Sequence, residues 1–187
     1  LASPNPSIVE KTIFDLEQHS RIMDFMNLPA THQFNINIHV GGVYGDKAKT
    51  LERFVHNFSR LSKNLQNRLT VENDDTKNGY RVEDLIHLTH GIGVPIVFDT
   101  LHWQCNPGNL DYDSAFRLAY STWNQLKFVP EIHHASSRKL NEDASAPLRA
   151  HADFIYEQVN TLGLPAYVTI ESKMKEQALL RYREQFQ

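Results

Sequence analysis

The sequence predicts an α/β fold in which parallel strands alternate with helices, and three observations support this prediction. Short apolar segments rich in β-branched residues recur along the chain, as in strands that are covered on both faces. Amphipathic segments separate them, and successive strands start roughly 30 residues apart, the length of one strand–helix unit. The 187 residues, 41% of them hydrophobic, suit one domain with a core, so we expect residues 1–187 to form a single domain.

The expected elements follow one another without a repeat or a low-complexity linker. The first is a helix over 7–26, with Ile13 and Leu16 among its periodic apolar residues and Ser7 as its expected N-cap. The later helices are expected over 48–64, 81–90 (closed by Gly91), 114–123, 148–162 (stopped by Gly163) and 175–186. Strands are expected over 34–40, 69–71, 94–98, 128–133 and 167–170.

Alternation of strands and helices implies parallel pairing in one sheet. Five units make an open sheet or part of a TIM (β/α)8 barrel, because a complete barrel needs eight units and typically ~250 residues. We therefore expect residues 1–187 to form a partial TIM barrel.

Composition narrows the class of protein. The formal net charge is only −3, and no polybasic arm is present. Mild acidity is not typical of DNA binding, although bound divalent metals supply positive charge where side chains do not. No apolar run reaches the ~18 residues of a membrane helix, so no membrane partner is expected. The single cysteine, Cys105, forms no disulfide framework, which favours a reducing intracellular location, the cytoplasm in a bacterium.

A metal-ligand or acid–base residue stands at the expected carboxyl end of every strand. These residues are His39, Glu72, Asp99, His133 and Glu171. In a barrel, that end of the strands carries the active site. His102 lies three residues after Asp99, and an oxygen and a nitrogen ligand at this spacing suit zinc, manganese or iron.

Further candidates flank these strand ends. Glu131 and His133 are two residues apart on one strand and point to the same side, whereas His134 points away and is interpreted as structural. Lys173 and Lys175 follow the last strand, where they either meet phosphates or form a solvated face; we favour phosphate contact for Lys173.

Two or three metals held by shared carboxylates and histidines suit phosphodiester hydrolysis, because metals acidify water and neutralise phosphate charge. No Ser-His-Asp order, phosphate-binding P-loop or dinucleotide glycine fingerprint competes with this interpretation.

Six ordered segments, which cover nearly the whole chain, resemble the UV damage endonuclease family. They are 38–47, 69–74, 99–102, 106–108, 132–136 and 170–178. The resemblance implies a TIM barrel of which this chain holds about five C-terminal βα units, with three further units upstream of Leu1. It also implies an endonuclease that incises damaged double-stranded DNA on the 5′ side of UV photoproducts, with divalent metals, typically manganese.

The resemblance also assigns residues by motif. It implies metal ligation by His39, Glu72, Asp99, His102, His133, His151 and Glu171, of which Glu72 is the bridging carboxylate. His151, which the pattern alone marks as a surface histidine, stands in the place of a further ligand. Where the family has a lysine that can be carboxylated near the metals, this chain has Glu131, which either replaces that carboxylate or lies close by.

The candidate catalytic residues are therefore Glu72, Glu131 and Lys173, and the candidate substrate-binding residues are Lys173 and Lys175. The expected cofactors are two or three divalent ions, manganese first and zinc as the alternative. Two other functions stay open: a metal-dependent TIM-barrel sugar isomerase, and a degenerate module that binds DNA or metal without cutting. An incomplete barrel also leaves sheet edges exposed, so we expect the chain to self-associate.

Overall fold

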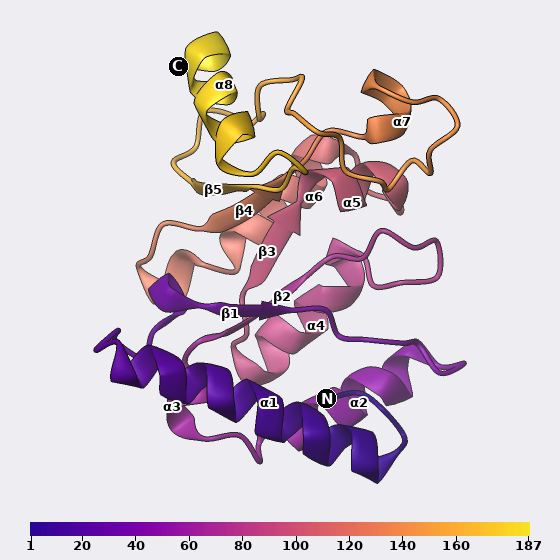
Figure 1. Ribbon diagram of the computed structural model, residues 1–187. Helices are drawn as coiled ribbons and strands as arrows, with labels where there is room; N and C mark the ends of the chain where they lie inside the picture. Colours follow the sequence, from indigo (N-terminus) through magenta and orange to yellow (C-terminus); the bar gives the residue numbers. More distant parts are fainter.

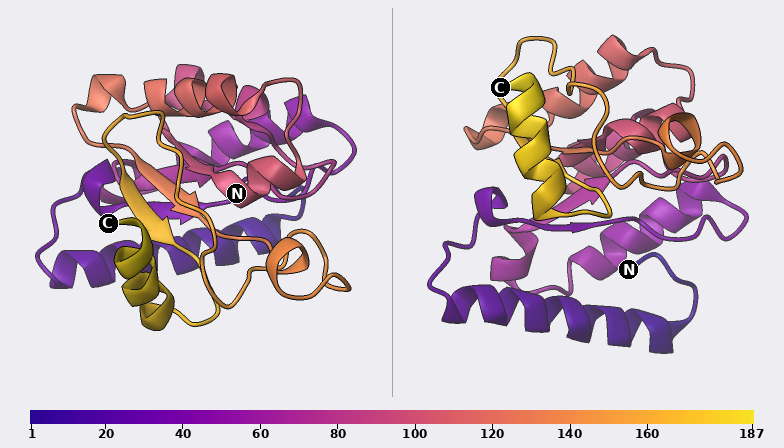
Figure 2. Two further views of the ribbon diagram at one scale, coloured as in Figure 1. Left: turned by 90° about the horizontal axis from the view of Figure 1, so that it is seen from above. Right: turned by 45° about the horizontal axis from the view of Figure 1, so that its top comes forward.

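A computed structural model describes all residues, 1–187, and its centre is one five-stranded parallel sheet with the strand order β1-β2-β3-β4-β5. The strands are β1 (Ile36–Ile38), β2 (Leu69–Glu72), β3 (Ile96–Asp99), β4 (Glu131–His134) and β5 (Tyr167–Ile170). The sheet curls into a half-barrel (Figures 1 and 2) whose outer strands, β1 and β5, each have one unpaired edge. The predicted α/β class with parallel strands is confirmed.

The chain forms eight helices in all. They are α1 (Pro6–Phe25), α2 (Lys47–Phe58), α3 (Lys63–Gln66), α4 (Val82–Ile92), α5 (Thr100–Cys105), α6 (Tyr112–Ser121), α7 (Arg138–Asn141) and α8 (Glu176–Phe186), with 3₁₀ turns η1 (His32–Phe34) and η2 (Asn124–Leu126). Helices α4 and α6 lie together on the outer side of the curled sheet, where both contact β3 (Figure 2). None of the helices has the length and apolar character that crossing a membrane requires.

Side-chain alternation along the strands separates an apolar outer face from a polar inner face. The outward side chains join a buried hydrophobic core with α2, α4 and α6; they include Leu69, Val71, Ile96, Phe98 and Ile132. The intervening side chains point to the concave side. This set contains most of the polar candidates: Thr70, Glu72, Asp99, Glu131 and His133. The same period of two that builds the core therefore collects the polar groups on the inner face.

Two expected helix ends lie two residues from their predicted places. The N-cap of α1 is Asn5, whose side chain accepts a hydrogen bond from the Ser7 backbone N–H at 2.9 Å, because Pro6 already takes the first helical position. Helix α4 runs through Gly91 and ends at Gly93, which has φ +74°. A left-handed residue is needed at that point, and glycine adopts it without a Cβ clash.

The other boundaries differ by a few residues. The expected strand 34–40 shortens to β1 because η1 takes Phe34, and the expected helix 48–64 divides into α2 and α3.

The expected helix over 148–162 is wrong. Its backbone groups are taken by distant partners instead: Arg138 N–H donates to the Ala150 carbonyl at 2.7 Å, and Ala152 N–H donates to the Ser136 carbonyl at 2.9 Å. An isolated antiparallel bridge joins Ser137 to His151. Tertiary hydrogen bonds thus outweigh the local apolar spacing that predicted a helix.

His32 makes stability depend on pH. Burial lowers the pKa of this imidazole to about 4, and its Nε2 is buried without a hydrogen-bond partner beside Trp123. In the unfolded chain the pKa of this imidazole is about 6.5, so the unfolded chain binds the proton more strongly than the folded chain. The free energy of unfolding is therefore highest above pH ~6.5 and falls as pH drops toward 4. Between pH 7 and pH 5, the wild-type chain should lose about 1–2 kcal/mol more of its unfolding free energy than the His32→Phe variant, measured by urea unfolding. Equal losses for both proteins would contradict this.

Candidate metal centre

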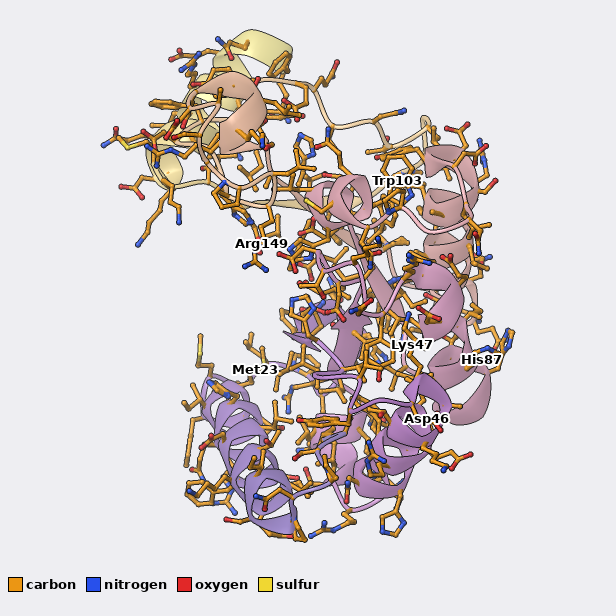
Figure 3. All side chains as sticks on the ribbon, turned by 90° about the vertical axis from the view of Figure 1, so that its right-hand side faces the viewer. Met23, Asp46, Lys47, His87, Trp103 and Arg149 are labelled. Carbon is orange, nitrogen blue, oxygen red and sulfur yellow. The ribbon has the colours of Figure 1, made fainter.

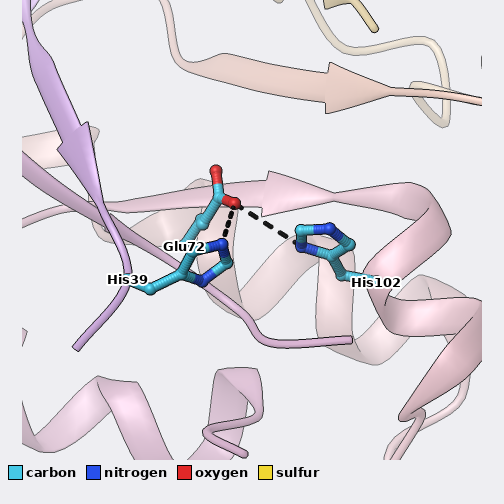
Figure 4. Close-up of side chains that lie close together, drawn as sticks. All are labelled: His39, Glu72 and His102. Carbon is cyan, nitrogen blue, oxygen red and sulfur yellow. Dashed lines mark ion pairs between the residues drawn. The ribbon is translucent and has the colours of Figure 1, made fainter. Parts of the chain in front are cut away.

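Glu72 is the centre of a cluster of histidines at the carboxyl ends of the strands. Its Oε1 lies 2.8 Å from His39 Nε2 and 3.5 Å from His102 Nδ1 (Figure 4). Its Oε2 lies 3.1 Å from His133 Nδ1. Only 8% of the Glu72 side chain is exposed, and His102 and His133 are buried with it, whereas the His39 side chain is 44% exposed at the edge of the cluster.

The strand register explains why these residues meet. Asp99 pairs with His133 across β3 and β4, and Glu72 ends the adjacent strand β2. Asp99 is also the N-cap of α5, where its Oδ1 accepts the His102 backbone N–H at 2.7 Å. The cap turns the chain at once into a helix and returns His102 to the cluster.

Two groups of side chains have ligand atoms that all lie within 4.8 Å of one another: His39, Glu72 and His102, and Glu72, Asp99 and His133. Glu72 belongs to both groups. Carboxylate oxygens mixed with imidazole nitrogens are a donor set for zinc or manganese.

Buried atoms without hydrogen bonds support this fit. Asp99 Oδ2 and His133 Nδ1 are both buried and have no hydrogen-bond partner. His133 Nδ1 is nevertheless 3.1 Å from a Glu72 oxygen and 3.2 Å from a Glu171 oxygen. Donor atoms this close, without hydrogen-bond alignment, converge as ligands do around a shared cation, and leaving them unpaired would be costly. The residues therefore fit a divalent metal.

Contacts from the turn after β2 hold two of the histidine rings. His102 Nδ1, the nitrogen that lies 3.5 Å from Glu72, is 2.9 Å from the Asn73 carbonyl. His39 faces Glu72 with Nε2, and its other nitrogen, Nδ1, lies 2.6 Å from Asp74 Oδ1, as is usual for a metal-binding histidine. Sequence analysis missed Asp74 in this role, although it lies two residues after Glu72 in the same turn.

Side-chain amides form hydrogen bonds with the Asp99 backbone and with the Glu72 carboxylate. The Asn73 side chain donates to the Asp99 carbonyl at 3.0 Å and accepts the Asp99 backbone N–H at 2.9 Å. Asn37 donates to Glu72 and accepts from the Thr70 hydroxyl at 3.0 Å. Neither asparagine was a predicted site residue; Asn37 had the signal of an inward position on a strand otherwise made of isoleucine.

Burial and neighbouring charges shift the pKa values of the side chains in the cluster. Burial by itself would lower the pKa of His39, but the hydrogen bonds to Asp74 and Glu72 raise it to about 10. Burial would raise the pKa of Glu72, yet His133 and His39 hold it well below its usual range. Burial raises the pKa of Asp99. Concentrated carboxylates and basic imidazoles let a divalent cation bind in exchange for protons.

Glu131 lies beside the cluster but outside both groups. Its oxygens accept hydrogen bonds from Thr169 Oγ1 at 2.6 Å and Asn35 Nδ2 at 2.5 Å. His133 Nε2 is 3.6 Å away. The structure thus places Glu131 against a predicted ligand on the concave face.

Glu171 links the cluster to the last predicted ligand. Its Oε2 lies 3.8 Å from His151 Nδ1. His151, Glu171, Lys173 and Lys175 line one surface pocket, so these four predicted residues come together at the β5 end of the sheet. His134 makes only structural bonds, to Thr100 Oγ1 at 2.8 Å and the Glu157 carbonyl at 3.2 Å.

A bound divalent ion is expected to stabilise this fold. The ligands lie on β2, β3, β4 and α5, so unfolding would disperse them. Manganese at about 100 times its Kd should add roughly 2.7 kcal/mol to the free energy of unfolding. Thermal unfolding with manganese, and then with excess EDTA, measures the gain and its reversal. An unchanged Tm in both would contradict a metal site.

Comparisons with known proteins agree on one family. The family described as UV-endonuclease UvdE matches residues 1–187. A UV DNA damage endonuclease of Bacillus pumilus is 32% identical over 98% of this chain, and one of Bacillus velezensis is 31% identical over the same share. The crystal structure of SacUVDE superposes with a TM-score of 0.81 at 27% identity and covers 99% of this chain.

The chain spans 57% of the length of both Bacillus proteins and 62% of the SacUVDE chain. The match nevertheless includes every strand and every predicted ligand, because it extends over the whole of residues 1–187. This chain belongs to the UV-endonuclease UvdE family.

Proposed function

We propose that this chain carries the metal centre of a DNA repair endonuclease that hydrolyses the phosphodiester backbone on the 5′ side of UV photoproducts in double-stranded DNA. The observation that carries the proposal is the convergence of three histidines on Glu72, in a member of the UvdE family. Two or three divalent ions, manganese first and zinc as the alternative, are the proposed cofactors. An enzyme of DNA repair would work inside the cell, as the lone cysteine predicts.

Different residues are proposed for metal binding, for orientation of a ligand and for phosphate contact. His39, Glu72, Asp99, His102, His133, His151 and Glu171 are the proposed ligands. When bound, the metals supply an acidified water and positive charge for the phosphate. Glu131, held by Thr169 and Asn35, keeps a carboxylate beside His133 and is proposed to orient it. Lys173 and Lys175, which line a pocket with His151 and Glu171, are proposed to meet phosphates, and Lys173 is also proposed to assist the leaving oxygen.

The test is incision of an end-labelled duplex, irradiated or not, with manganese present. A product that maps immediately 5′ to the photoproduct, and no product from the unirradiated duplex, is the expected result. If neither duplex is incised although two or three manganese ions are bound per chain, the degenerate binding module is favoured. Turnover of a ketose without affinity for DNA would favour the isomerase.

Self-association of the chain is a separate expectation. The unpaired edge of β1 lies next to an apolar groove formed with α1, lined by Leu16, Ile22, Met23, Met26 and Ile38 among others. Phe25 at the end of α1 is 87% exposed. Exposed apolar patches beside an open sheet edge promote association. Light scattering should show mass rising with concentration; a constant monomer mass would contradict this.

A further inference from the structure

Arg149 lies at the rim of the metal centre, on the loop between α7 and β5. The base of that loop is fixed, because the neighbouring Ala150 carbonyl accepts the Arg138 N–H at 2.7 Å and His151 is bridged to Ser137. Figure 3 shows the Arg149 side chain projecting toward the open, concave side of the half-barrel. The positively charged side chain of Arg149 thus extends from a backbone segment that is held by hydrogen bonds, two residues before the proposed metal ligand His151.

The acidic partner of Arg149 lies on a different loop, between β2 and α4. Arg149 Nη1 is 3.8 Å from Asp75 Oδ2, and the arginine side chain is 59% exposed. Asp75 directly follows Asp74, the carboxylate that holds His39. An exposed ion pair at this distance contributes little to stability and breaks easily. The pair therefore leaves the guanidinium available to a stronger anion.

A phosphodiester is the anion that this position suits. A guanidinium forms paired hydrogen bonds with two phosphate oxygens, and Lys173 and Lys175 already flank His151 on the β5 side. The floor of the site is rich in carboxylates and the net charge is −3, so a polyanion needs cations around the rim.

We propose that Arg149 binds a backbone phosphate of the DNA next to the incision site, and that Asp75 holds the guanidinium in place until the DNA displaces it. This inference rests on the proposed function. Arg149 is a substrate-positioning residue in this scheme, and it reads backbone rather than base sequence.

Five variants of the full chain, one of them a double variant, test the idea by fluorescence anisotropy with irradiated and unirradiated duplexes at several salt concentrations. Arg149→Gln should weaken binding to both duplexes alike, by about tenfold, and lower the slope of log affinity against log salt by about 0.9. Arg149→Lys should keep the slope and lose less affinity. Arg117→Gln is the matched control, since Arg117 is exposed on α6, in the outer layer. Asp75→Asn should tighten binding about threefold, but not when combined with Arg149→Gln.

The kinetics separate positioning from folding. Arg149→Gln should raise KM and leave kcat nearly unchanged, since a rim phosphate is bound equally before and during the reaction. A salt slope equal to that of Arg117→Gln would overturn the inference, as would an affinity loss confined to irradiated DNA. If the wild-type chain incises DNA and the slope is unchanged, only this inference fails. If it binds neither duplex, the proposed function fails with it.

Discussion

Replacing Glu72 by glutamine is expected to lower incision at least about a thousandfold, because metal stabilisation is worth several kcal/mol and each ~1.4 kcal/mol is a factor of ten. Glu72 is the residue shared by both groups of candidate ligands, so one substitution disturbs both. Glutamine keeps the shape and the bond to Asn37 but removes the charge that faces His39 and His133. The bound manganese should fall by at least one ion per chain.

Two measurements check this result. Elemental analysis after dialysis gives the metal stoichiometry, and nicking of an irradiated duplex gives the rate. Glu52→Gln is the matched control, because Glu52 is an exposed residue of α2 and makes the same change of charge. A Glu72→Gln protein with wild-type manganese content and wild-type nicking would remove Glu72 from the metal centre.

Replacing Asn73 by alanine is expected to cost about 2–4 kcal/mol of unfolding free energy, although Asn73 is not itself a proposed ligand. Asn73 is 2% exposed, and its side chain makes two hydrogen bonds with the Asp99 backbone. Alanine leaves the buried N–H of Asp99 without a partner and removes one hydrogen bond to its carbonyl, and it frees the end of β3. The affinity for manganese should fall about 10- to 100-fold, as for other groups that orient ligands.

Urea unfolding and a manganese titration measure the two effects separately. Asn109→Ala is a suitable control, because Asn109 is exposed and contributes its backbone N–H, not its side chain, to a bond with Glu83. If stability falls while manganese affinity is unchanged, Asn73 is a structural residue only. If neither changes, the Asn73–Asp99 bonds contribute nothing measurable.

Much of the fold was predictable because local patterns set it. Short apolar segments rich in β-branched residues located all five strands, and helical spacing located the helices that pack on the core. The failure over 148–162 shows where such patterns stop being informative. Apolar residues there do satisfy a helical period, but the backbone bonds to Ser136 and Arg138, which are distant in the sequence, decide the conformation.

The candidate site was likewise predictable only in part. The sequence by itself determined that an acid or a histidine ends each strand, and parallel strands bring their carboxyl ends to one edge whatever the details of packing. Only the tertiary structure decided that Glu72 faces three histidines, that Asp74 and Asn73 orient His39, His102 and Asp99, and that Arg149 reaches Asp75. The reason is physical: strand ends follow from local sequence patterns, whereas these contacts join separate strands and loops and exist only after the sheet has formed.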